Sequence, residues 1–194
     1  MVLMIPSNYP VYRREMGSHM YSASSYFTAA TFSNLCTNIF YPILVSLLTF
    51  FFYDYPISDF GGFLAFFSVE AAAALAGICY GQVIGSFITT EYAAMTWLMQ
   101  SLTIYYLGAG MLTNAGSGSN WFGDFLQWIS PLRYLNELAM RRMLAGRRED
   151  LSDEILNYLG FTWGVAWCSV ATSLYIIGCL CIGLFLLHYF AKGT

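Results

Sequence analysis

Long stretches without a charged side chain constrain this chain more than any other feature. No Asp, Glu, Lys or Arg occurs in residues 16–53, 71–90, 92–123 or 155–191. A helix needs roughly 20 apolar residues to cross a bilayer, and a backbone inside lipid must satisfy its own hydrogen bonds, which favours helices. The runs lack the apolar–polar alternation of membrane β-barrel strands. The chain is therefore expected to be an all-α integral membrane protein.

The composition supports the same interpretation. Hydrophobic residues make up 58% and charged residues 10% of the 194 residues, whereas soluble domains average about 25% charged residues. A soluble fold of this length has too little interior to bury so much apolar surface. The formal net charge is -3 and the basic residues form no patch, so nucleic acid is not an expected partner.

The chain is predicted to have four spanning helices, at about 32–53, 60–88, 92–113 and 161–190. Residues 1–31 precede them, and the part 11–30 is predicted to be an amphipathic helix on the membrane surface. Residues 114–158, before the last helix, are expected to form an external element. Within it, residues 121–137 combine two Trp and two Phe with Ser130-Pro131, which is typical of an ordered helical segment at the membrane interface.

Four crossings place both termini on the same side of the membrane. Arg13, Arg14 and Lys192 favour the cytoplasmic or equivalent side for these termini. The multi-pass chain would then expose residues 114–158 on the opposite side. That segment contains five arginines beside six acidic residues, which weakens the charge argument for this orientation.

The predicted spans contain several residues that affect the shape of the helices or the packing between them. Pro42 is expected to kink the first span. Glu70 is an acid inside an apolar run, where a charge is costly, and the sequence leaves open a ligand or proton site and a structural role. Small residues that allow close helix packing recur every four positions in the second span, at Ala73, Gly77, Gly81 and Gly85.

No residues form a catalytic or metal-binding pattern. The two histidines, His19 and His188, lie near opposite ends of the chain, and Ser130 has no histidine near it. Lys192 is the single lysine, and no G-x-x-x-x-G precedes it, so an ATP-binding P-loop is absent. We therefore expect no enzyme activity, no metal and no cofactor in this chain. ATP would act only through a partner subunit, whereas bound lipids are expected.

Motifs spread over nearly the whole chain point to one family. In order they are 11–15 (VYRRE) with Tyr21 and 25–27 (SYF), 41–42 (YP) with 51–53 (FFY), 110–114 (GMLTN), 121–137 and 159–163 (LGFTW). Together they resemble the membrane domain of the G subfamily of ABC transporters, the white and pleiotropic-drug-resistance type, which is an ABC-2 type membrane domain. The resemblance implies that residues 11–30 form a coupling helix and that residues 121–137 form a re-entrant external element. This chain would supply the last four of the family's six membrane helices.

The resemblance also implies roles for individual residues. The coupling segment would contact an ATPase through Arg13, Arg14 and Glu15. A central cavity would be gated by Met111 and Leu112 and lined below by Met99, Thr103 and Tyr106, although such residues in a membrane helix usually only pack. Separately, the i,i+4 spacing of Arg133 and Glu137 predicts a pair that braces the external element.

Two functions remain open at this point. The resemblance implies a membrane subunit that translocates lipid-like or hydrophobic molecules with a separate ATPase and other membrane subunits. The alternative is a structural accessory subunit that no longer transports and uses the small-residue stripe as a contact surface in a large membrane assembly. A short chain with no ATPase and an incomplete cavity fits the alternative, and the order of the motifs identifies only the family from which the fold derives.

Overall fold

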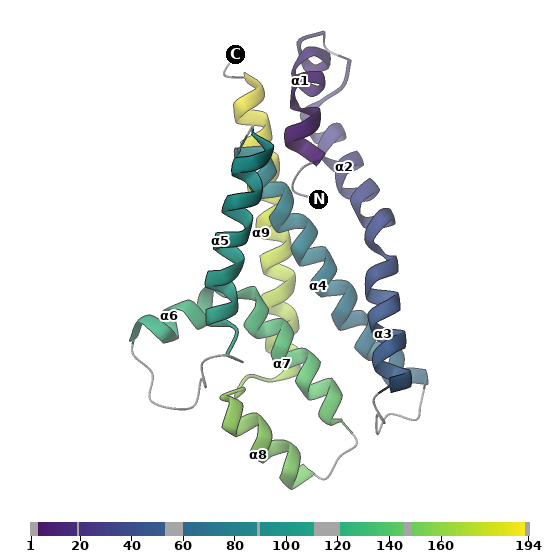
Figure 1. Cartoon of the computed structure of the whole chain (residues 1–194), viewed down its shortest axis with the longest axis vertical. Helices are drawn as coiled ribbons and strands as arrows, with labels where there is room; N and C mark the ends of the chain where they lie inside the picture. The colour runs from purple at the N-terminus through teal and green to yellow at the C-terminus, as the bar shows by residue number, and fades with distance from the viewer. Residues whose placement is uncertain are drawn as a thin grey trace. The chain divides into compact units, whose positions relative to one another are not determined.

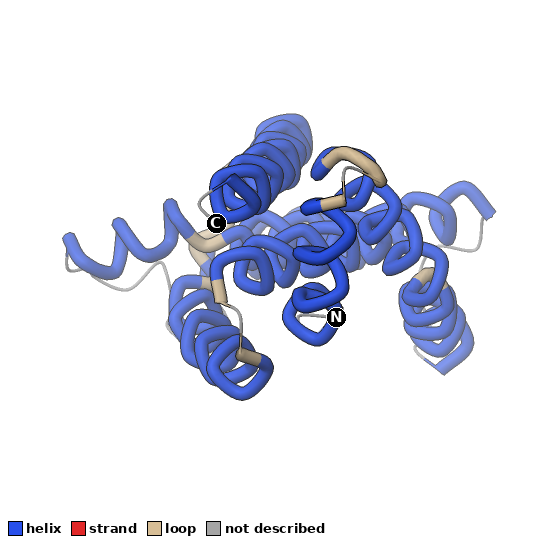
Figure 2. The backbone as a smooth tube through the Cα atoms, turned by 90° about the horizontal axis from the view of Figure 1, so that it is seen from above, coloured by secondary structure: helices blue, strands red, loops and turns tan. Residues whose placement is uncertain are grey.

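The computed structural model describes residues 4–18, 20–52, 60–88, 90–110, 121–145 and 149–192. Every regular element within these ranges is a helix (Figures 1 and 2). Three helical segments are long and apolar enough to cross a membrane: Ala23–Phe52, Phe60–Phe87 and Val165–Tyr189. The expected all-α integral membrane fold is confirmed.

The helices follow the chain in a simple order. They are α1 (Met4–Gly17), α2 (Ala23–Asn38), α3 (Phe40–Phe52), α4 (Phe60–Phe87), α5 (Glu91–Gly108), α6 (Trp121–Ile129), α7 (Pro131–Leu144), α8 (Glu149–Leu159) and α9 (Val165–Lys192). The second predicted span, 60–88, thus matches α4 within one residue. The last span begins at Val165 rather than at residue 161, since residues 161–164 are not helical.

The first span begins earlier than predicted. Its helix starts at Ala23 instead of residue 32. The single amphipathic helix expected over 11–30 is wrong, because residues 18 and 20–22 are not helical. Hydroxyl side chains in the first turns of α2 bond to their own helix backbone. The Oγ1 atoms of Thr28 and Thr31 donate to the carbonyls of Ser24 and Phe27, at 3.0 and 2.8 Å. Such bonds to the preceding turn let hydroxyl side chains lie in an apolar helix.

The disturbance predicted at Pro42 appears one turn earlier. The helix is interrupted by a turn at Ile39, between α2 and α3. Proline has no N–H, and its ring crowds the carbonyl of the residue four positions before it, which here is Asn38. The helix therefore loses its regular bonding at the turn before the proline.

The third predicted span, 92–113, corresponds to α5, which ends at Gly108. Residues 109 and 110 form a turn and a bend, and residues 111–113 lie outside the described residues. Helix α5 is not among the three candidate spans. Its acidic first residue and its polar Gln100 and Thr103 make it less apolar than they are.

The chain packs as two units, which we describe separately. The first unit contains Met1–Asn38, Leu75–Ser101 and Tyr175–Thr194, and the second contains Ile39–Ala74 and Leu102–Leu174. The core of the first unit is formed by Tyr12, Phe27 and Leu187, with Tyr21, Tyr26, Leu180 and Leu184 packed around them. The core of the second unit is formed by Val69, Tyr134, Leu138 and Cys168, with Ala139, Trp163 and Ala171 packed around them.

Candidate functional site

In the first unit, the N-terminal helix α1 is anchored to two spanning helices. Tyr12 of α1 is only 2% exposed and packs with Phe27 of α2 and Leu187 of α9. Its ring centroid lies 4.5 Å from that of Tyr26, within the range of favourable aromatic pairs. Close-packed interiors transmit displacements, so α1 is mechanically linked to α2 and α9.

The corner between α1 and α2 is fixed by polar contacts as well (Figure 1). The Tyr21 hydroxyl donates to Oε2 of Glu15 at 2.5 Å, and the Tyr21 ring stacks on Tyr26 with centroids 5.9 Å apart. The amide of Met20 donates to the carbonyl of Glu15 at 3.2 Å. Burial and then the hydrogen bond to Glu15 raise the pKa of Tyr21 to about 12. Arg14 remains exposed and is accessible to a partner protein.

Replacing Tyr21 with phenylalanine is expected to lower the free energy of unfolding by about 1 kcal/mol, the usual net value of one such hydrogen bond. Because the folded protein holds the phenolic proton more tightly than the unfolded chain does, this stabilisation is present below pH ~10 and is lost as pH rises toward 12. Thermal unfolding of the detergent-solubilised protein at pH 8 and pH 11 measures both effects. Tyr158→Phe, at an exposed position on α8, is the matched control, and equal shifts for the two variants would contradict the prediction.

In the second unit, the end of α5 is held against the corner between α6 and α7. Ser130, which joins these two helices, is fully buried, and its Oγ donates to the carbonyl of Tyr105 at 2.7 Å. A Cβ added to Gly108 would lie 2.6 Å from the carbonyl oxygen of Leu126 and 2.9 Å from Cβ of Ser130. Only glycine allows this backbone approach. Pro131 occupies the first turn of α7, where its missing N–H costs nothing.

Two arginines of α7 bind the backbone just before α9. Nη2 of Arg133 donates to the carbonyl of Gly160 at 3.1 Å, and Nη2 of Arg141 donates to the carbonyl of Phe161 at 3.0 Å. Gly160 has a φ of 72°, a conformation that favours glycine. The guanidinium carbon of Arg133 also lies 4.6 Å from the ring centroid of Trp163, a favourable cation–π distance. Burial lowers the pKa of Arg133 below its ordinary value.

Glu137 pairs with a different arginine from the predicted Arg133. Glu137 is fully buried and forms an ion pair with Arg141, with Nη2 and Oε1 2.9 Å apart. The expected Arg133–Glu137 brace is therefore replaced by Glu137–Arg141, while Arg133 binds Gly160 and Trp163. Glu before Arg at i,i+4 is the favourable order on a helix, and the predicted pair had the reverse order.

Aromatic rings complete the contacts of this region. The Trp163 ring stacks on Tyr134, with centroids 5.1 Å apart, and lies 4.8 Å from Trp128. The Tyr134 hydroxyl donates to the carbonyl of Trp128 at 2.9 Å. We call this set the α7 clamp: Trp128, Ser130, Arg133, Tyr134, Glu137, Arg141 and Trp163. It joins the end of α5, the α6–α7 corner and the residues just before α9. Its hydrogen bonds, ion pair and ring contacts hold these segments in fixed positions within the second unit.

Comparison of the sequence with protein-family models shows the family of this chain. The model of the ABC-2 type transporter matches residues 1–144, which include the α1–α2 corner and every α7 residue of the clamp. The chain belongs to the ABC-2 type transporter family. A comparison with curated proteins gives no match. The predicted ABC-2 type membrane domain is thus confirmed, and this domain is the membrane component of an ABC-type transporter.

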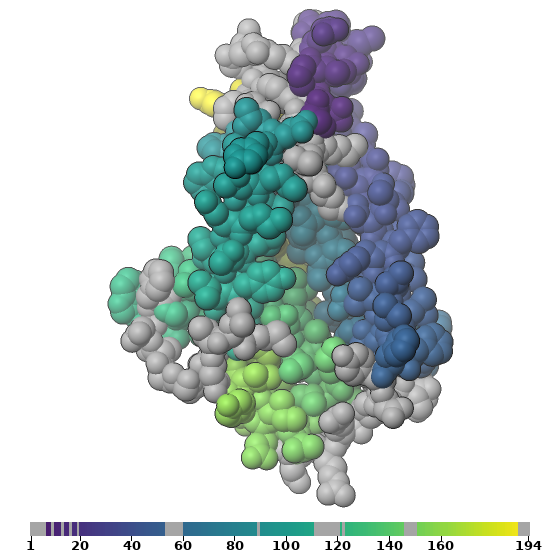
Figure 3. Space-filling view, in the orientation of Figure 1, coloured from purple at the N-terminus to yellow at the C-terminus, as the bar shows by residue number. Residues whose placement is uncertain are grey.

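The predicted cavity residues of this ABC-2 domain lie on α5 or beyond its end. Met99, Thr103 and Tyr106 are exposed on α5, and their spacing places them on one face of that helix. Helix α5, drawn in teal, lies on the face shown in Figure 3. Met111 and Leu112 lie outside the described residues. The cavity and its gate therefore stay predictions.

The structure gives positions for the other predicted residues of the ABC-2 domain, and their functional roles stay predictions. Glu70 lies half-buried on α4, and no ion pair among the described side chains includes it. Along the small-residue stripe, Gly77 is exposed and a Cβ added there would meet nothing within 4 Å. Ala73 is half-buried, Gly81 and Gly85 are buried, and Arg13 lies on α1 with its side chain outside the described part of the chain.

Sequence reasoning missed several residues that build the α7 clamp and its contacts. Arg141 could have been found, because it follows Glu137 by four positions in the favourable order. The close approach at Gly108 and the positive φ at Gly160 had no specific signal, since glycine is common near helix ends for other reasons. Trp163 is part of the 159–163 motif, which gave no signal that its ring contacts Trp128 and Tyr134.

Proposed function

We propose that this chain is the membrane subunit of a G-type ABC transporter that moves lipid-like or other hydrophobic small molecules with a separate ATPase. The observation that supports this proposal best is the burial of Tyr12 against Phe27 and Leu187. A transporter driven from outside the membrane needs a surface helix that is firmly joined to spanning helices. Helix α1 has that property, and the motif resemblance assigns it the coupling role.

The ATPase would bind the exposed side of α1. Arg14 and Glu15 lie at its C-terminal end, before the corner fixed by Tyr21. A push on this end would be carried to α2 and α9 through the aromatic core around Tyr12 rather than lost in a mobile linker. This arrangement suits alternating access, in which a partner's closure shifts a few spanning helices together.

The substrate would bind along the exposed face of α5. Met99 and Tyr106 give this face a mainly apolar surface, and the hydroxyl of Thr103 lies between them along the helix. Sites for apolar molecules use many hydrophobic contacts and few polar groups. A second membrane subunit, or another copy of this chain, would complete the cavity.

Co-purification tests the proposal directly. The full chain would be extracted in a mild detergent with its native lipids, and its partners would be identified by mass spectrometry. An ATPase subunit recovered in stoichiometric amount supports transport. Recovery of the intact chain with no ATPase subunit would overturn the proposal.

Replacing Tyr12 with alanine is expected to uncouple ATP hydrolysis from transport. The change removes the ring that joins α1 to α2 and α9, so substrate moved per ATP should fall by about tenfold, since coupling free energies are typically about 1–3 kcal/mol. Transport and ATPase activity would be measured together after reconstitution with the ATPase partner. The hydrolysis rate should persist while transport is lost.

Two variants control this experiment. Tyr12→Phe keeps the buried ring and should transport as the unmodified protein does. Val11→Ala changes the adjacent, exposed position on α1 and should leave the coupling ratio unchanged. If Tyr12→Ala lowers hydrolysis and transport by the same factor, α1 is needed for assembly with the ATPase and does not transmit its motion.

A non-transporting accessory subunit is the second candidate, and one observation favours it. Gly77 lies exposed on α4 with open space where a Cβ would be, which leaves room for the backbone of another helix. Native gel electrophoresis distinguishes the two functions. Migration within one large multi-subunit assembly that lacks an ATPase supports the accessory role, and a free particle of dimer size contradicts it.

A further inference from the structure

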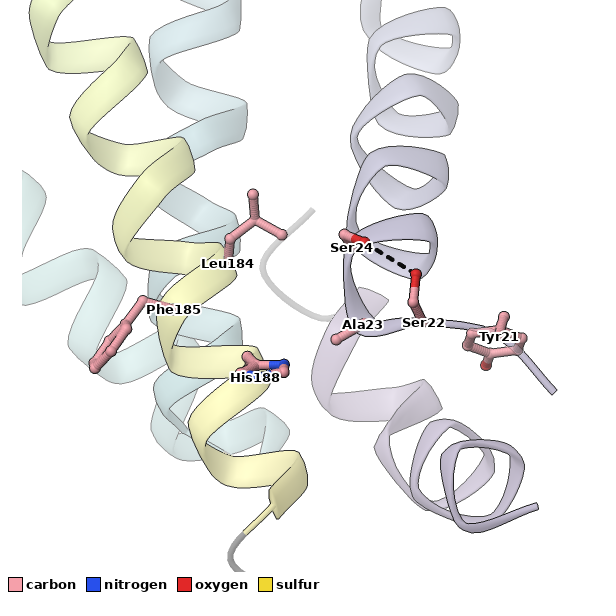
Figure 4. A pocket seen from close by; sticks show the side chains of 7 residues that line it. All are labelled: Tyr21, Ser22, Ala23, Ser24, Leu184, Phe185 and His188. Carbon is pink, nitrogen blue, oxygen red and sulfur yellow. Dashed lines mark hydrogen bonds between the residues drawn. The ribbon is translucent and has the colours of Figure 1, made fainter. Parts of the chain in front are cut away.

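The first unit contains a pocket between the beginning of α2 and the last turns of α9. Its volume is about 680 Å³. Figure 4 shows Leu184 and His188 of α9 pointing toward α2, where Ser22, Ala23 and Ser24 lie. The proposed transport path uses α5 instead, so this pocket has no role in it.

The polar end of the pocket offers hydrogen-bond donors and acceptors together. The hydroxyls of Ser22 and Ser24 lie 2.9 Å apart and bond each other. Oγ of Ser22 also lies 2.9 Å from Oγ of Ser25 and accepts the Ser25 amide at 3.3 Å, so Ser22 is fully bonded. The Ser24 hydroxyl keeps hydrogen-bonding capacity for another molecule. The His188 imidazole across the pocket contributes further hydrogen-bonding capacity. Among the described residues, no lysine or arginine lines the pocket. A hydroxyl-bearing group, itself donor and acceptor, matches this set better than an acceptor-only phosphate does.

The rest of the pocket is apolar, and beyond the pocket an exposed apolar face continues along α9. Leu184 and Ala23 form its walls. Cys181 and Ile177, both exposed, follow Leu184 at helical spacing on the same face of α9. From residue 188 to residue 177 the helix rises about 16 Å, close to half of the roughly 30 Å hydrocarbon core. One acyl chain of a single leaflet therefore fits this face with its headgroup at His188.

We propose that the pocket binds an uncharged lipid with a hydroxyl-bearing headgroup, of the diacylglycerol type. The headgroup hydroxyl bonds to Ser24 and His188, and an acyl chain lies along Leu184, Cys181 and Ile177. This site binds lipid without ATP hydrolysis and independently of any substrate on α5. Its failure and the failure of the proposed transport function are thus distinguishable.

Photolabelling of the full chain tests the site. The protein would be reconstituted in phosphatidylcholine nanodiscs with a diacylglycerol that carries a photoreactive group in its acyl chain, and labelled peptides would be mapped by mass spectrometry. Labelling is expected at residues 177–184. Unlabelled diacylglycerol should compete, and phosphatidic acid should compete about tenfold less well, because no lysine or arginine among the described pocket residues offsets the negative charge of its phosphate.

Substitutions inside and outside the pocket separate a specific site from general lipid contact. Leu184→Trp fills the pocket and should abolish labelling, whereas Leu174→Trp at an exposed position on the same helix should not. Ser24→Ala with His188→Ala removes two hydrogen-bonding groups and should weaken binding about tenfold, while Ser33→Ala should leave it unchanged. Labelling that is equal in both tryptophan variants means annular lipid and overturns the site. Stronger competition by phosphatidic acid overturns the uncharged headgroup.

Discussion

Replacing Gly108 with alanine is expected to lower the free energy of unfolding of this ABC-2 membrane domain by about 3 kcal/mol, at the upper end of the usual cost of overpacking. The new Cβ would lie 2.6 Å from the carbonyl oxygen of Leu126. That oxygen belongs to the backbone of α6 and accepts the amide of Ser130 at 3.0 Å, so it has little freedom to move. Unfolding of the solubilised protein, followed during titration with a denaturing detergent, measures the loss.

A second glycine provides the control for this substitution. Gly77→Ala places a methyl group where nothing lies within 4 Å, and alanine favours a helix over glycine by up to about 1 kcal/mol. That variant should be as stable as the unmodified protein or more so. If both alanine variants behave alike, the contact between α5 and the α6–α7 corner does not contribute to stability in the membrane.

The second large effect is expected from Arg141→Ala. The variant leaves the carboxylate of Glu137 fully buried without its partner, and breaking a buried ion pair from one side costs about 3–5 kcal/mol. It also removes the donor to the carbonyl of Phe161. Thermal unfolding in detergent should show a large loss of stability, together with looser packing where α9 begins.

The ion pair can be tested apart from this backbone contact. Adding Glu137→Leu to Arg141→Ala removes the uncompensated charge and should recover part of the lost stability, since apolar replacements of buried pairs are often tolerated. Glu154→Ala, at an exposed position on α8, should change stability by less than about 0.5 kcal/mol. A double variant that is less stable than Arg141→Ala would show that Glu137 has other favourable partners.

The spanning helices were predictable where apolar residues end abruptly. Helix α4 is preceded in the sequence by Asp54 and Asp59 and followed by Thr89-Thr90-Glu91, so its predicted limits differ from the structure by one residue. The beginning of α2 was not predictable in the same way. Its serines and threonines make its first turns polar in composition, but the hydroxyls of Thr28 and Thr31 bond to their own helix backbone. Composition does not record that internal satisfaction.

The candidate site was likewise predictable only in part. The predicted ABC-2 family is confirmed. Residues 121–137 lie in α6, the corner at Ser130 and α7, and their external, re-entrant placement stays a prediction. The partners within the α7 clamp depend on tertiary approach: Ser130 binds Tyr105 and Arg133 binds Gly160, which are 25 and 27 positions away. No local spacing rule covers such distances. The position of Tyr12 was predictable only in part. Its apolar character was evident from the sequence, whereas its burial against α9 was not.

The length of the spanning helices makes this domain sensitive to the thickness of the bilayer. Helix α4 has 28 residues, which corresponds to about 42 Å at 1.5 Å per residue, whereas a typical hydrocarbon core is about 30 Å thick. The excess is accommodated by tilting, by ends that emerge among the headgroups or by local thickening of the bilayer, each at a modest cost per ångström. Bilayer thickness therefore enters the energetics of this domain directly. A change in lipid composition that thickens the membrane shifts its preferred helix tilt without any site-specific ligand.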